Sequence, residues 1–405
     1  MKAAEDIVKQ KVLHLIDSFH QGGTERQAVQ LVRLLSDSGR YNVRVACLHK
    51  EGMLRDEIEK FGLGEIPEYS LTSFYNRNMW RQLRRFARFL RKQEIDVVHT
   101  HDFYTNIFGM AGAKLAGTKA RIASRRETNG VRTRPQKIVE RAAYKFAGAI
   151  IANAEAVRRQ LIVEGVPERK TKVIYNGLDV SRVAPQGNLS RNEMLAKLDL
   201  PRAGEEQRFV TIVANLRLAV KDHPMFLRAA KRVCESVPEA NFLLAGEGDL
   251  TGKLQTLAAE LGLTGKAFFL GRCENIAELL AVSDVCVLSS KAEGFSNSIL
   301  EYMAAARAVV ATDVGGAREA IAENETGFLV SSGDDEALAA RIIFLLRNAE
   351  RAREMGERGR RIIEEKFSCE AQLRRTEEVY DQLLAATHAP ANESLQAARR
   401  ESLLK

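Results

Sequence analysis

Short apolar runs alternate with helical segments along almost the whole chain. The runs lack polar alternation, as expected of strands buried on both faces. Because helical segments separate them, the strands should pair in parallel through βαβ units. The first half holds six runs, at 11–17, 42–48, 96–101, 121–126, 149–154 and 172–177, and the second holds five, at 209–216, 241–246, 267–271, 285–290 and 308–313. The pattern predicts an α/β chain with two doubly wound parallel sheets.

Two domains also fit the length of the chain. Single cores usually stop growing near ~250–300 residues, and this chain has 405 residues, 45% of them hydrophobic. The segment 179–208 carries two prolines and polar turns. We therefore place the domains at 1–185 and 186–370, followed by a helix and a polar tail at 371–405. Ligands bind beyond the carboxyl ends of such strands, so the cleft between the domains is the expected active site.

Several classes of protein are disfavoured by composition. No apolar run approaches the ~20 residues that a membrane-spanning helix needs, and the first residues lack the apolar stretch of a signal peptide. The five cysteines are scattered, with no C-x-x-C pair and no His/Cys cluster at metal-ligand spacing. We expect a cytoplasmic protein without disulfides or structural zinc.

The net charge of +8 is unevenly distributed. Residues 1–185 hold 33 Lys/Arg against 20 Asp/Glu (+13), and the other 220 residues hold 28 against 33 (−5). No RNP, zinc-finger or homeodomain pattern is present, and aromatic residues make up only 6%. We expect no nucleic-acid partner, which leaves an anionic membrane surface or a phosphate-bearing substrate for the basic half.

Two stretches can bind an anion through helix N-termini. Gly22 and Gly23 follow the first strand, and Thr24 with Gln27 fits a capping box for the next helix. In the stretch "SSKAEGFSNSILEYMA" (289–304), a helix should begin near Asn297 and point its free N–H groups at the cleft. A plain βα turn explains the first stretch equally well.

Four charged residues flank these stretches. Glu293 stands on the loop before the helix and Glu301 lies in an early turn, where each carboxylate can accept hydrogen bonds from hydroxyl groups of a bound ligand. Arg217 and Lys221 lie four apart after the first strand of the second half, where two cations could neutralise a diphosphate. Surface positions and surface salt bridges are the alternative explanation for each of them.

The stretch 269–330 resembles the donor-binding core of the retaining GT-B glycosyltransferases of family 4, whose signature is Glu, seven residues, Glu. The stretches "GGTERQ", "DVVHTH", "VIYNGLD", "NLRLAVKDH" and "LAGEGDL" follow the order found in that family. The resemblance covers roughly residues 11–385. It implies two Rossmann-like domains facing across a cleft, with C-terminal helices returning to the N-terminal domain, and a hexosyltransferase that uses a nucleotide sugar such as a UDP- or GDP-sugar.

The same resemblance implies roles for individual residues. Arg217 and Lys221 would hold the donor diphosphate, Glu293 would contact the donor sugar, and Glu301 would accept hydrogen bonds from the ribose. The remaining donor-binding residues would be Gly22, Gly23, Arg272, Cys273, Gly294, Phe295, Ser296, Asn297, Ser298 and Ile299.

The chain departs from the family at one place. Relatives often carry a histidine after a strand of the N-terminal domain, where this chain reads "ASRRETNG", with Arg125 and Arg126. We assign these arginines to the acceptor side of the cleft and treat His101 as a substitute catalytic residue beside Arg217, Lys221 and Glu293. No Asp-x-Asp is present, so we expect neither a metal nor another cofactor.

Other functions remain open on the same plan. These are a sugar epimerase, a phosphorylase and a catalytically idle protein that binds nucleotide sugars. A pyridoxal-dependent phosphorylase normally has a longer chain, and the presence of Arg217, Lys221, Glu293 and Glu301 argues against an idle protein.

The segment 76–92 carries seven Arg/Lys and no acidic residue. Trp80, Leu83, Ala87 and Leu90 recur at helical spacing, which predicts a helix that covers the sheet with this stripe and turns its arginines outward. Relatives commonly glycosylate lipid-linked or envelope acceptors. We therefore expect an acceptor of this kind and peripheral contact of the N-terminal domain with an anionic membrane.

Overall fold

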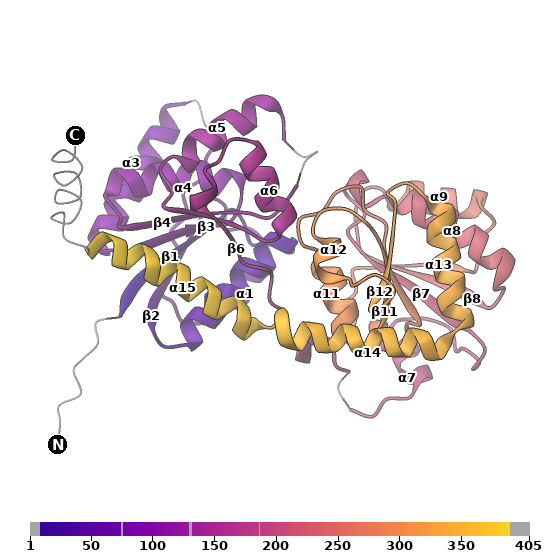
Figure 1. Ribbon diagram of the computed structural model, residues 1–405. Coiled ribbons are helices and arrows are strands. Elements are labelled where there is room, and N and C mark those ends of the chain that lie inside the picture. Colours follow the sequence, from indigo (N-terminus) through magenta and orange to yellow (C-terminus); the bar gives the residue numbers. More distant parts are fainter. Residues whose placement is uncertain (1–8, 74–75, 129–131, 186, 389–405) are drawn as a thin grey trace, which may run out of the picture.

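The computed structural model describes residues 9–73, 76–128, 132–185 and 187–388 (Figure 1). Residues 389–405, which hold most of the polar tail expected after the last helix, lie outside this range. Every strand belongs to one of two six-stranded sheets, whose paired strands all run parallel.

The first sheet has the strand order β2-β1-β3-β4-β5-β6. Helices cover both of its faces, because its strands are apolar on both sides. Its strands are β1 (Gln10–Ile16), β2 (Tyr41–Cys47), β3 (Val97–Thr100), β4 (Ala120–Arg125), β5 (Ala149–Ala152) and β6 (Thr171–Val173). Its helices are α1 (Gly23–Asp37), α2 (Leu54–Glu59), α3 (Arg77–Lys92), α4 (Phe103–Ala116), α5 (Arg134–Tyr144) and α6 (Glu155–Val163), with a short 3-10 turn, η1 (Glu168–Lys170).

The second sheet has the order β12-β11-β10-β7-β8-β9. Its strands are β7 (Arg208–Val213), β8 (Ala240–Ala245), β9 (Ala267–Gly271), β10 (Val285–Leu288), β11 (Ala308–Thr312) and β12 (Gly327–Val330). The surrounding elements are η2 (Val180–Val183), α7 (Arg191–Lys197), η3 (Ala219–Lys221), α8 (His223–Ser236), α9 (Thr251–Glu260), α10 (Ile276–Val282), α11 (Asn297–Ala304), α12 (Ala317–Ala320), α13 (Asp335–Arg347) and α14 (Ala349–Lys366).

These two sheets confirm the predicted fold class. Each of the eleven apolar runs contains a strand, and only β12 was missed. Strand β12 follows the polar stretch 323–326, begins at a glycine and pairs with β11 at the edge of the sheet.

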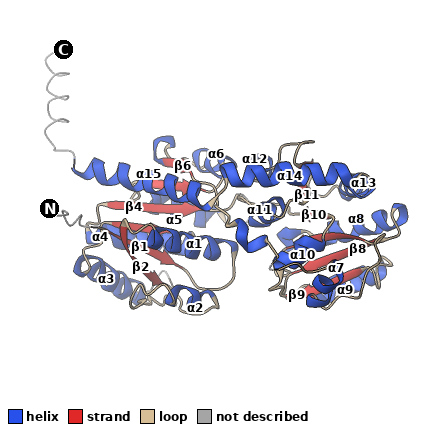
Figure 2. Cartoon of the chain, turned by 90° about the horizontal axis from the view of Figure 1, so that it is seen from below, coloured by secondary structure: helices blue, strands red, loops and turns tan. Residues whose placement is uncertain are grey.

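The last helix, α15 (Cys369–His388), returns to the N-terminal domain as expected. In Figure 1 it runs along that domain, while α14 runs along the other, and Figure 2 shows the two helices end to end. The chain passes between the domains at two neighbouring points: Leu178 N–H donates to Phe367 O at 2.9 Å, and Leu178 pairs with Ser368 in a β-bridge.

The predicted capping box at Thr24 and Gln27 is wrong. Helix α1 begins two residues earlier, with Gly22 as N-cap and no side-chain cap. The Gln27 side chain points into the protein instead, where its Nε2 donates to Gly177 O at 3.1 Å, next to the crossover. A buried backbone carbonyl needs hydrogen-bond donors, so the Gln27 side chain points towards the carbonyl of Gly177.

Helix α3 corrects a second expectation. Its buried stripe consists of Met79, Leu83, Phe86, Ala87 and Leu90, whereas Trp80 is 64% exposed. Met79 is aligned with Leu83, Phe86 and Leu90 on the helical wheel, and Trp80 lies a further 100° around it. Trp80 therefore stands outside among the arginines.

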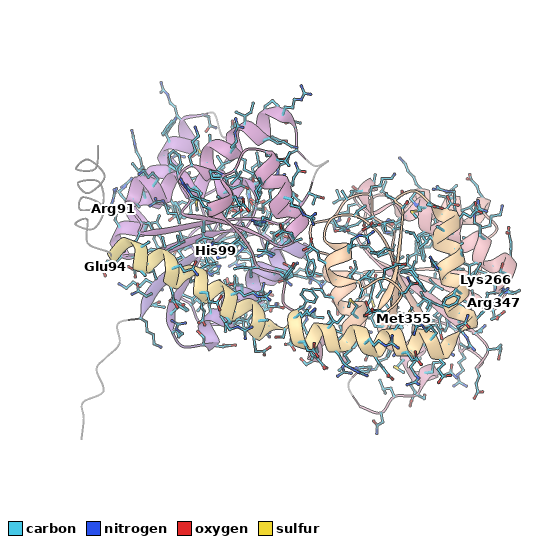
Figure 3. The ribbon with its side chains drawn as sticks, viewed as in Figure 1. Arg91, Glu94, His99, Lys266, Arg347 and Met355 are labelled. Atoms are coloured by element: carbon cyan, nitrogen blue, oxygen red, sulfur yellow. The ribbon has the colours of Figure 1, made fainter. Side chains whose placement is uncertain are left out.

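A polar contact joins α15 to the sheet. His99 on β3, at the centre of the N-terminal domain in Figure 3, contacts Tyr380 OH through Nδ1 and Ser124 Oγ through Nε2, both at 2.8 Å. All three side chains are buried.

Replacing Tyr380 with Phe should therefore lower the free energy of unfolding of the N-terminal domain by about 1–3 kcal/mol, because His99 keeps a buried nitrogen without a partner. Asp381→Asn is the control. It weakens an exposed ion pair with Arg40, which should change stability by less than about 1 kcal/mol. Urea unfolding of the two variants checks this, and equal losses would contradict it.

Candidate active site

A cavity of about 690 Å³ lies between the carboxyl ends of the two sheets. Both domains line it, and its wall includes almost all of the residues singled out from the sequence. These are Gly22, Gly23, Arg126, Arg217, Lys221, Arg272, Cys273, Glu293, Gly294, Phe295, Ser296, Asn297, Ser298 and Glu301. Ile299 is buried in the core behind this wall. Parallel strands bring these loops together because all of them leave the sheets at the same edge.

Lys221 and Glu293 form the central pair. Lys221 Nζ lies 2.5 Å from Glu293 Oε1, and Ser290 Oγ donates to the same oxygen at 2.6 Å. The side chains of Lys221 and Glu293 are 19% and 12% exposed. Their loops are also joined through the backbone, since Lys291 N–H donates to Val220 O at 2.7 Å. The pair is therefore held rigidly at the mouth of β7 and β10.

Arg217 lies on the same loop as Lys221 but has a different partner. Its Nη2 donates to Glu247 Oε1 at 2.9 Å, and both side chains are more than half exposed. An exposed pair of this kind is held weakly, so the guanidinium can turn towards a ligand. Glu247, which also lines the cavity, was not predicted from the sequence. The sequence feature that could have pointed to Glu247 is the pair Gly246 and Gly248 on either side of it, just after β8. In the structure, both glycines have φ above 150°.

Helix α11 begins at Asn297, as predicted. Its first backbone bond within the helix runs from Leu300 N–H to Ser296 O at 3.4 Å, so the earlier N–H groups have no acceptor inside the helix. Glu301 lies one turn further on, partly buried at the cavity. Burial raises the pKa of the Glu301 carboxyl, while Arg26 and Arg182 pull it down.

The loop before α11 touches the N-terminal domain directly. Thr128 Oγ1 donates to Glu293 O at 2.6 Å, and a Cβ on Gly294 would lie 2.0 Å from Arg126 O. Only glycine fits at position 294 in this arrangement. Asn176 adds two contacts, from Nδ2 to Asn297 Oδ1 at 2.8 Å and to Phe295 O at 3.1 Å. The contacts made by Thr128 and Asn176 could not be foreseen, because they join residues more than 100 positions apart.

Arg126 faces the cavity, and Arg125 does not. Arg126 Nη1 donates to Asn176 Oδ1 at 2.8 Å, while its Nε is buried without a partner among the residues that the structure describes. Burial lowers the pKa of Arg126 to about 10, against the opposing effect of Glu25 and Asp102. The Arg126 guanidinium therefore stands at the cavity wall with one buried donor unsatisfied.

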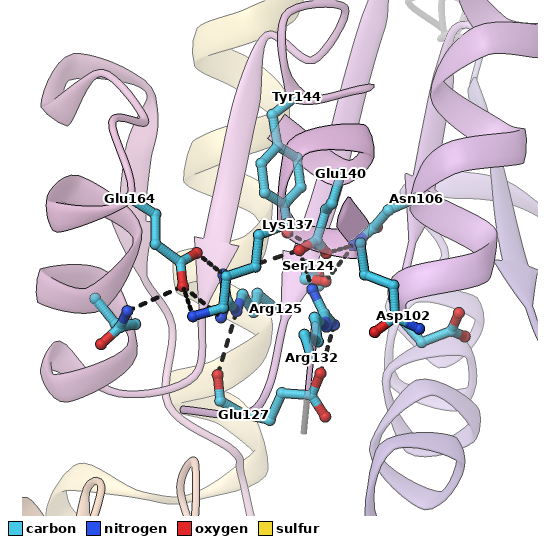
Figure 4. A network of polar contacts seen from close by, with 12 residues as sticks. Asp102, Asn106, Ser124, Arg125, Glu127, Arg132, Lys137, Glu140, Tyr144 and Glu164 are labelled. Carbon is cyan, nitrogen blue, oxygen red and sulfur yellow. Dashed lines mark hydrogen bonds and ion pairs between the residues drawn. The ribbon is translucent and has the colours of Figure 1, made fainter. Parts of the chain in front are cut away.

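The assignment of Arg125 to the acceptor side of the cleft is wrong. It is 1% exposed and forms ion pairs with Glu164 and Glu140 in the network of Figure 4, where Arg132 also pairs with Glu140. Strand β4 ends at Arg125, and Arg126 is the first residue of the loop that follows it, so the two side chains leave this edge of the sheet in different directions. Arg125 holds α5 and α6 together instead.

His101 is likewise away from the cavity. It is 1% exposed, and its Nε2 lies 2.8 Å from His14 Nδ1. Burial lowers the pKa of His101 far below its usual value, so the imidazole is neutral. The assignment of His101 as a catalytic residue is therefore corrected, because its ring lies inside the domain rather than at the cleft.

His14, His99 and His101 bring one nitrogen each within 4.8 Å of one another, which is close enough to hold a metal ion. Their contacts favour another role. His99 uses both nitrogens for Tyr380 and Ser124, and the 2.8 Å contact between His14 and His101 is a hydrogen-bond distance. The three rings form a polar core that joins β1 and β3 to α15.

Acidic groups on the N-terminal side were not foreseen either. Asp17 and Asp102 follow the adjacent strands β1 and β3, and Glu25 lies in the first turn of α1. Burial, followed by the nearby charge of Asp17, raises the pKa of Asp102 to about 7. Burial also raises the pKa of Asp17 and Glu25. Of these three carboxylates, Glu25 lines the cavity, whereas Asp17 and Asp102 lie behind its wall.

Known proteins share both halves of the chain. The family described as "Glycosyl transferases group 1" matches residues 199–362, and "Glycosyltransferase Family 4" matches residues 21–182. EpsD of Bacillus subtilis (strain 168), named as a glycosyltransferase, is 31% identical over 303 residues, covering 71% of this chain and 76% of EpsD.

A second relative and a solved structure extend the comparison. The UDP-Gal:alpha-D-GlcNAc-diphosphoundecaprenol alpha-1,3-galactosyltransferase of Escherichia coli is 24% identical over 331 residues, covering 77% of this chain and 81% of the enzyme. The crystal structure of HepE from Anabaena in complex with UDP superposes with a TM-score of 0.81 at 20% identity, covering 92% of this chain and 100% of HepE. This likeness concerns the fold.

Proposed function

This chain belongs to the GT-B glycosyltransferases of family 4, and on that premise we propose that it transfers a hexosyl group from a nucleoside diphosphate sugar to a lipid-linked or other cell-envelope saccharide. The donor is a sugar attached to a nucleotide such as UDP or GDP. Transfer proceeds with retention of the anomeric configuration, as the family resemblance implies. The named acceptor of the E. coli relative, a diphosphoundecaprenol-linked sugar, supports the acceptor class.

One observation carries this proposal: Lys221, Arg217 and the N-terminus of α11 surround one cavity. Negative charge develops on the diphosphate as the bond to the sugar breaks, and groups already aimed at that position stabilise it. An ammonium group has three donors, so Lys221 can keep its bond to Glu293 and still bind a phosphate oxygen. The leaving group therefore needs no general acid.

The two glutamates supply acceptors for hydroxyl groups. Glu293 Oε1 accepts hydrogen bonds from both Lys221 and Ser290, whereas none of the described residues donates to Oε2. This oxygen can accept a hydroxyl of the donor sugar. Glu301, one helical turn along α11, can accept from the ribose on the other side of the diphosphate. We assign no covalent nucleophile.

Glu293→Ala and Arg217→Ala should each lower kcat/KM by at least about tenfold, which corresponds to roughly 1.4 kcal/mol of transition-state stabilisation. The matched controls are Glu364→Ala and Arg360→Ala, which remove the same residue types from an exposed ion pair on α14. Release of the nucleoside diphosphate with a panel of donor sugars measures the effect, and product analysis separates transfer from epimerisation. Turnover close to wild type in both site variants would contradict the assignment.

We also propose that the diphosphate is neutralised without a metal ion, by Lys221, Arg217 and the tip of α11. Activity should then survive an excess of EDTA, because no divalent ion bridges the phosphates. The assay is the same release of nucleoside diphosphate, after chelation and gel filtration. A complete loss that only Mg²⁺ or Mn²⁺ restores would show that the cationic side chains are insufficient.

The N-terminal domain offers a surface for an anionic membrane. Trp80, Arg84 and Arg88 lie four residues apart on α3 and are all exposed. No carboxylate of the described residues forms an ion pair with Arg84 or Arg88. Arg85 is exposed as well, but its guanidinium is engaged by the protein, since Nη1 donates to Glu68 O and the group lies over the Tyr69 ring. None of the described helices is long and apolar enough to cross a bilayer. We propose that this stripe rests on the lipid headgroups, with Trp80 at the interface.

Replacing Arg84 and Arg88 with Gln should therefore lower co-sedimentation with vesicles that contain anionic lipid, and 1 M salt should do the same, since the Debye length shrinks from ~10 Å at 0.1 M to ~3 Å. The control replaces Arg353 and Arg360 on α14, which are 63% and 53% exposed, and removes the same charge from the other domain. Equal losses in both variants would point to net charge alone. Failure to bind either anionic or neutral vesicles at low salt would leave a soluble acceptor.

A further inference from the structure

Helix α6 begins without a cap of its own. Its N-cap residue is Ala154, whose side chain has no hydrogen-bonding group. The first N–H groups of the helix are satisfied by the other domain: Glu155 N–H donates to Glu319 Oε2 at 2.6 Å, and Ala156 N–H donates to Glu319 Oε1 at 2.8 Å. A carboxylate at a helix N-terminus also interacts favourably with the helix dipole. Both oxygens of one side chain are therefore used across the domain interface.

Glu319 lies on α12, directly after the turn that supports the donor loop. Gly316, the last residue of that turn, donates its N–H to Gly294 O at 2.7 Å. The fit to the N-terminal domain is close, since a Cβ on Gly316 would lie 2.8 Å from Ala154 Cβ. The turn that leads to Glu319 is thus hydrogen-bonded to the loop that carries Glu293.

Tyr175 stabilises this contact from the side. Its ring centroid lies 4.9 Å from that of Phe295 and 5.2 Å from that of Phe367, which joins the donor loop to the crossover. Burial, together with the nearby Glu319 carboxylate, raises the pKa of Tyr175 to about 12, so the phenol stays neutral and can donate a hydrogen bond.

We infer that Glu319 is a positioning residue, which caps α6 from the opposite domain and thereby holds the donor loop 293–297 against the N-terminal domain. The contact exists only while the cleft is closed. Opening the cleft leaves two N–H groups of α6 without their acceptor, because Ala154 cannot replace it. Closure is therefore favoured by a bond that the sequence around α6 cannot supply by itself.

This inference rests on the proposed function for its effect on the reaction. When only the closed form binds the donor fully, the apparent dissociation constant equals the intrinsic one divided by the closed fraction. Weakening the cap lowers that fraction. The donor KM should then rise, while kcat at saturating donor changes little, since a bound donor restores the closed arrangement.

The test compares Glu319→Ala and Glu319→Gln with the control Glu325→Ala, which removes an exposed glutamate from the next turn of the same domain. Hydrogen exchange of the peptide 154–163 reports the cap directly, and small-angle scattering reports the closure. In Glu319→Ala we expect exchange at least tenfold faster at Glu155 and Ala156, a larger radius of gyration and a donor KM at least fivefold higher, with kcat within twofold of wild type. Glu319→Gln keeps the volume and one acceptor oxygen, so its effects should be intermediate.

A second variant separates the cap from the domain contact. Ala154→Ser in the Glu319→Ala background supplies a cap from within the same domain. It should slow the exchange at Glu155 and Ala156 again and leave the radius of gyration and the KM at the values of Glu319→Ala. If the serine restored all three, Glu319 would serve only the stability of α6, and the inference would be overturned.

The exchange and scattering results do not depend on activity. Unchanged exchange and unchanged dimensions in Glu319→Ala would refute the interdomain cap, even if the enzyme transfers sugar as proposed. If Glu319→Ala shows fast exchange and an open form, the interdomain cap is supported. If the wild type then releases no nucleoside diphosphate with any donor, the proposed function is refuted and the cap is not.

Discussion

In a parallel sheet, the loops that follow the strands all lie at the same edge. In this protein, the two edges of this kind face each other. The crossover at Leu178 and Phe367 holds the sheets in this relation, since a backbone hydrogen bond ties the outgoing chain to the returning one. Residues from distant parts of the sequence consequently meet at one cavity. The position of Glu293, Arg126 and Glu319 depends on this single arrangement.

The cations of the cavity are all engaged before a ligand arrives. In the C-terminal domain, Lys221 is bound to Glu293 inside the wall and Arg217 to Glu247 at the rim. In the N-terminal domain, Arg126 is bound to Asn176. A paired charge that is only partly buried avoids most of the desolvation cost of an isolated one. The pairs also hold the nitrogens in place at the cavity wall.

In the N-terminal domain, several other ionisable residues stabilise the fold. Arg125 joins α5 and α6 through Glu140 and Glu164, and the three histidines connect β1 and β3 to α15 through Tyr380. Such networks are stable only when nearly every group has a partner. They explain why conspicuous residues of the sequence, such as His101, lie away from the cleft.

The sequence by itself determined what depends on local spacing: eleven of the twelve strands, the start of α11 at Asn297, and the loops that carry Glu293 and Lys221. Apolar periodicity and unpaired helix ends are written in neighbouring residues. The tertiary structure decided what depends on direction and on distant partners. Arg126 faces the cavity from the loop after β4, while Arg125 at the strand's end is buried in the domain. Packing turned Trp80 outward, and the side chain of Gln27 turned inward to the carbonyl of Gly177. Glu319 caps α6 from the other domain. A hydrogen bond between residues more than 100 positions apart leaves no periodic trace, so only the folded chain shows it.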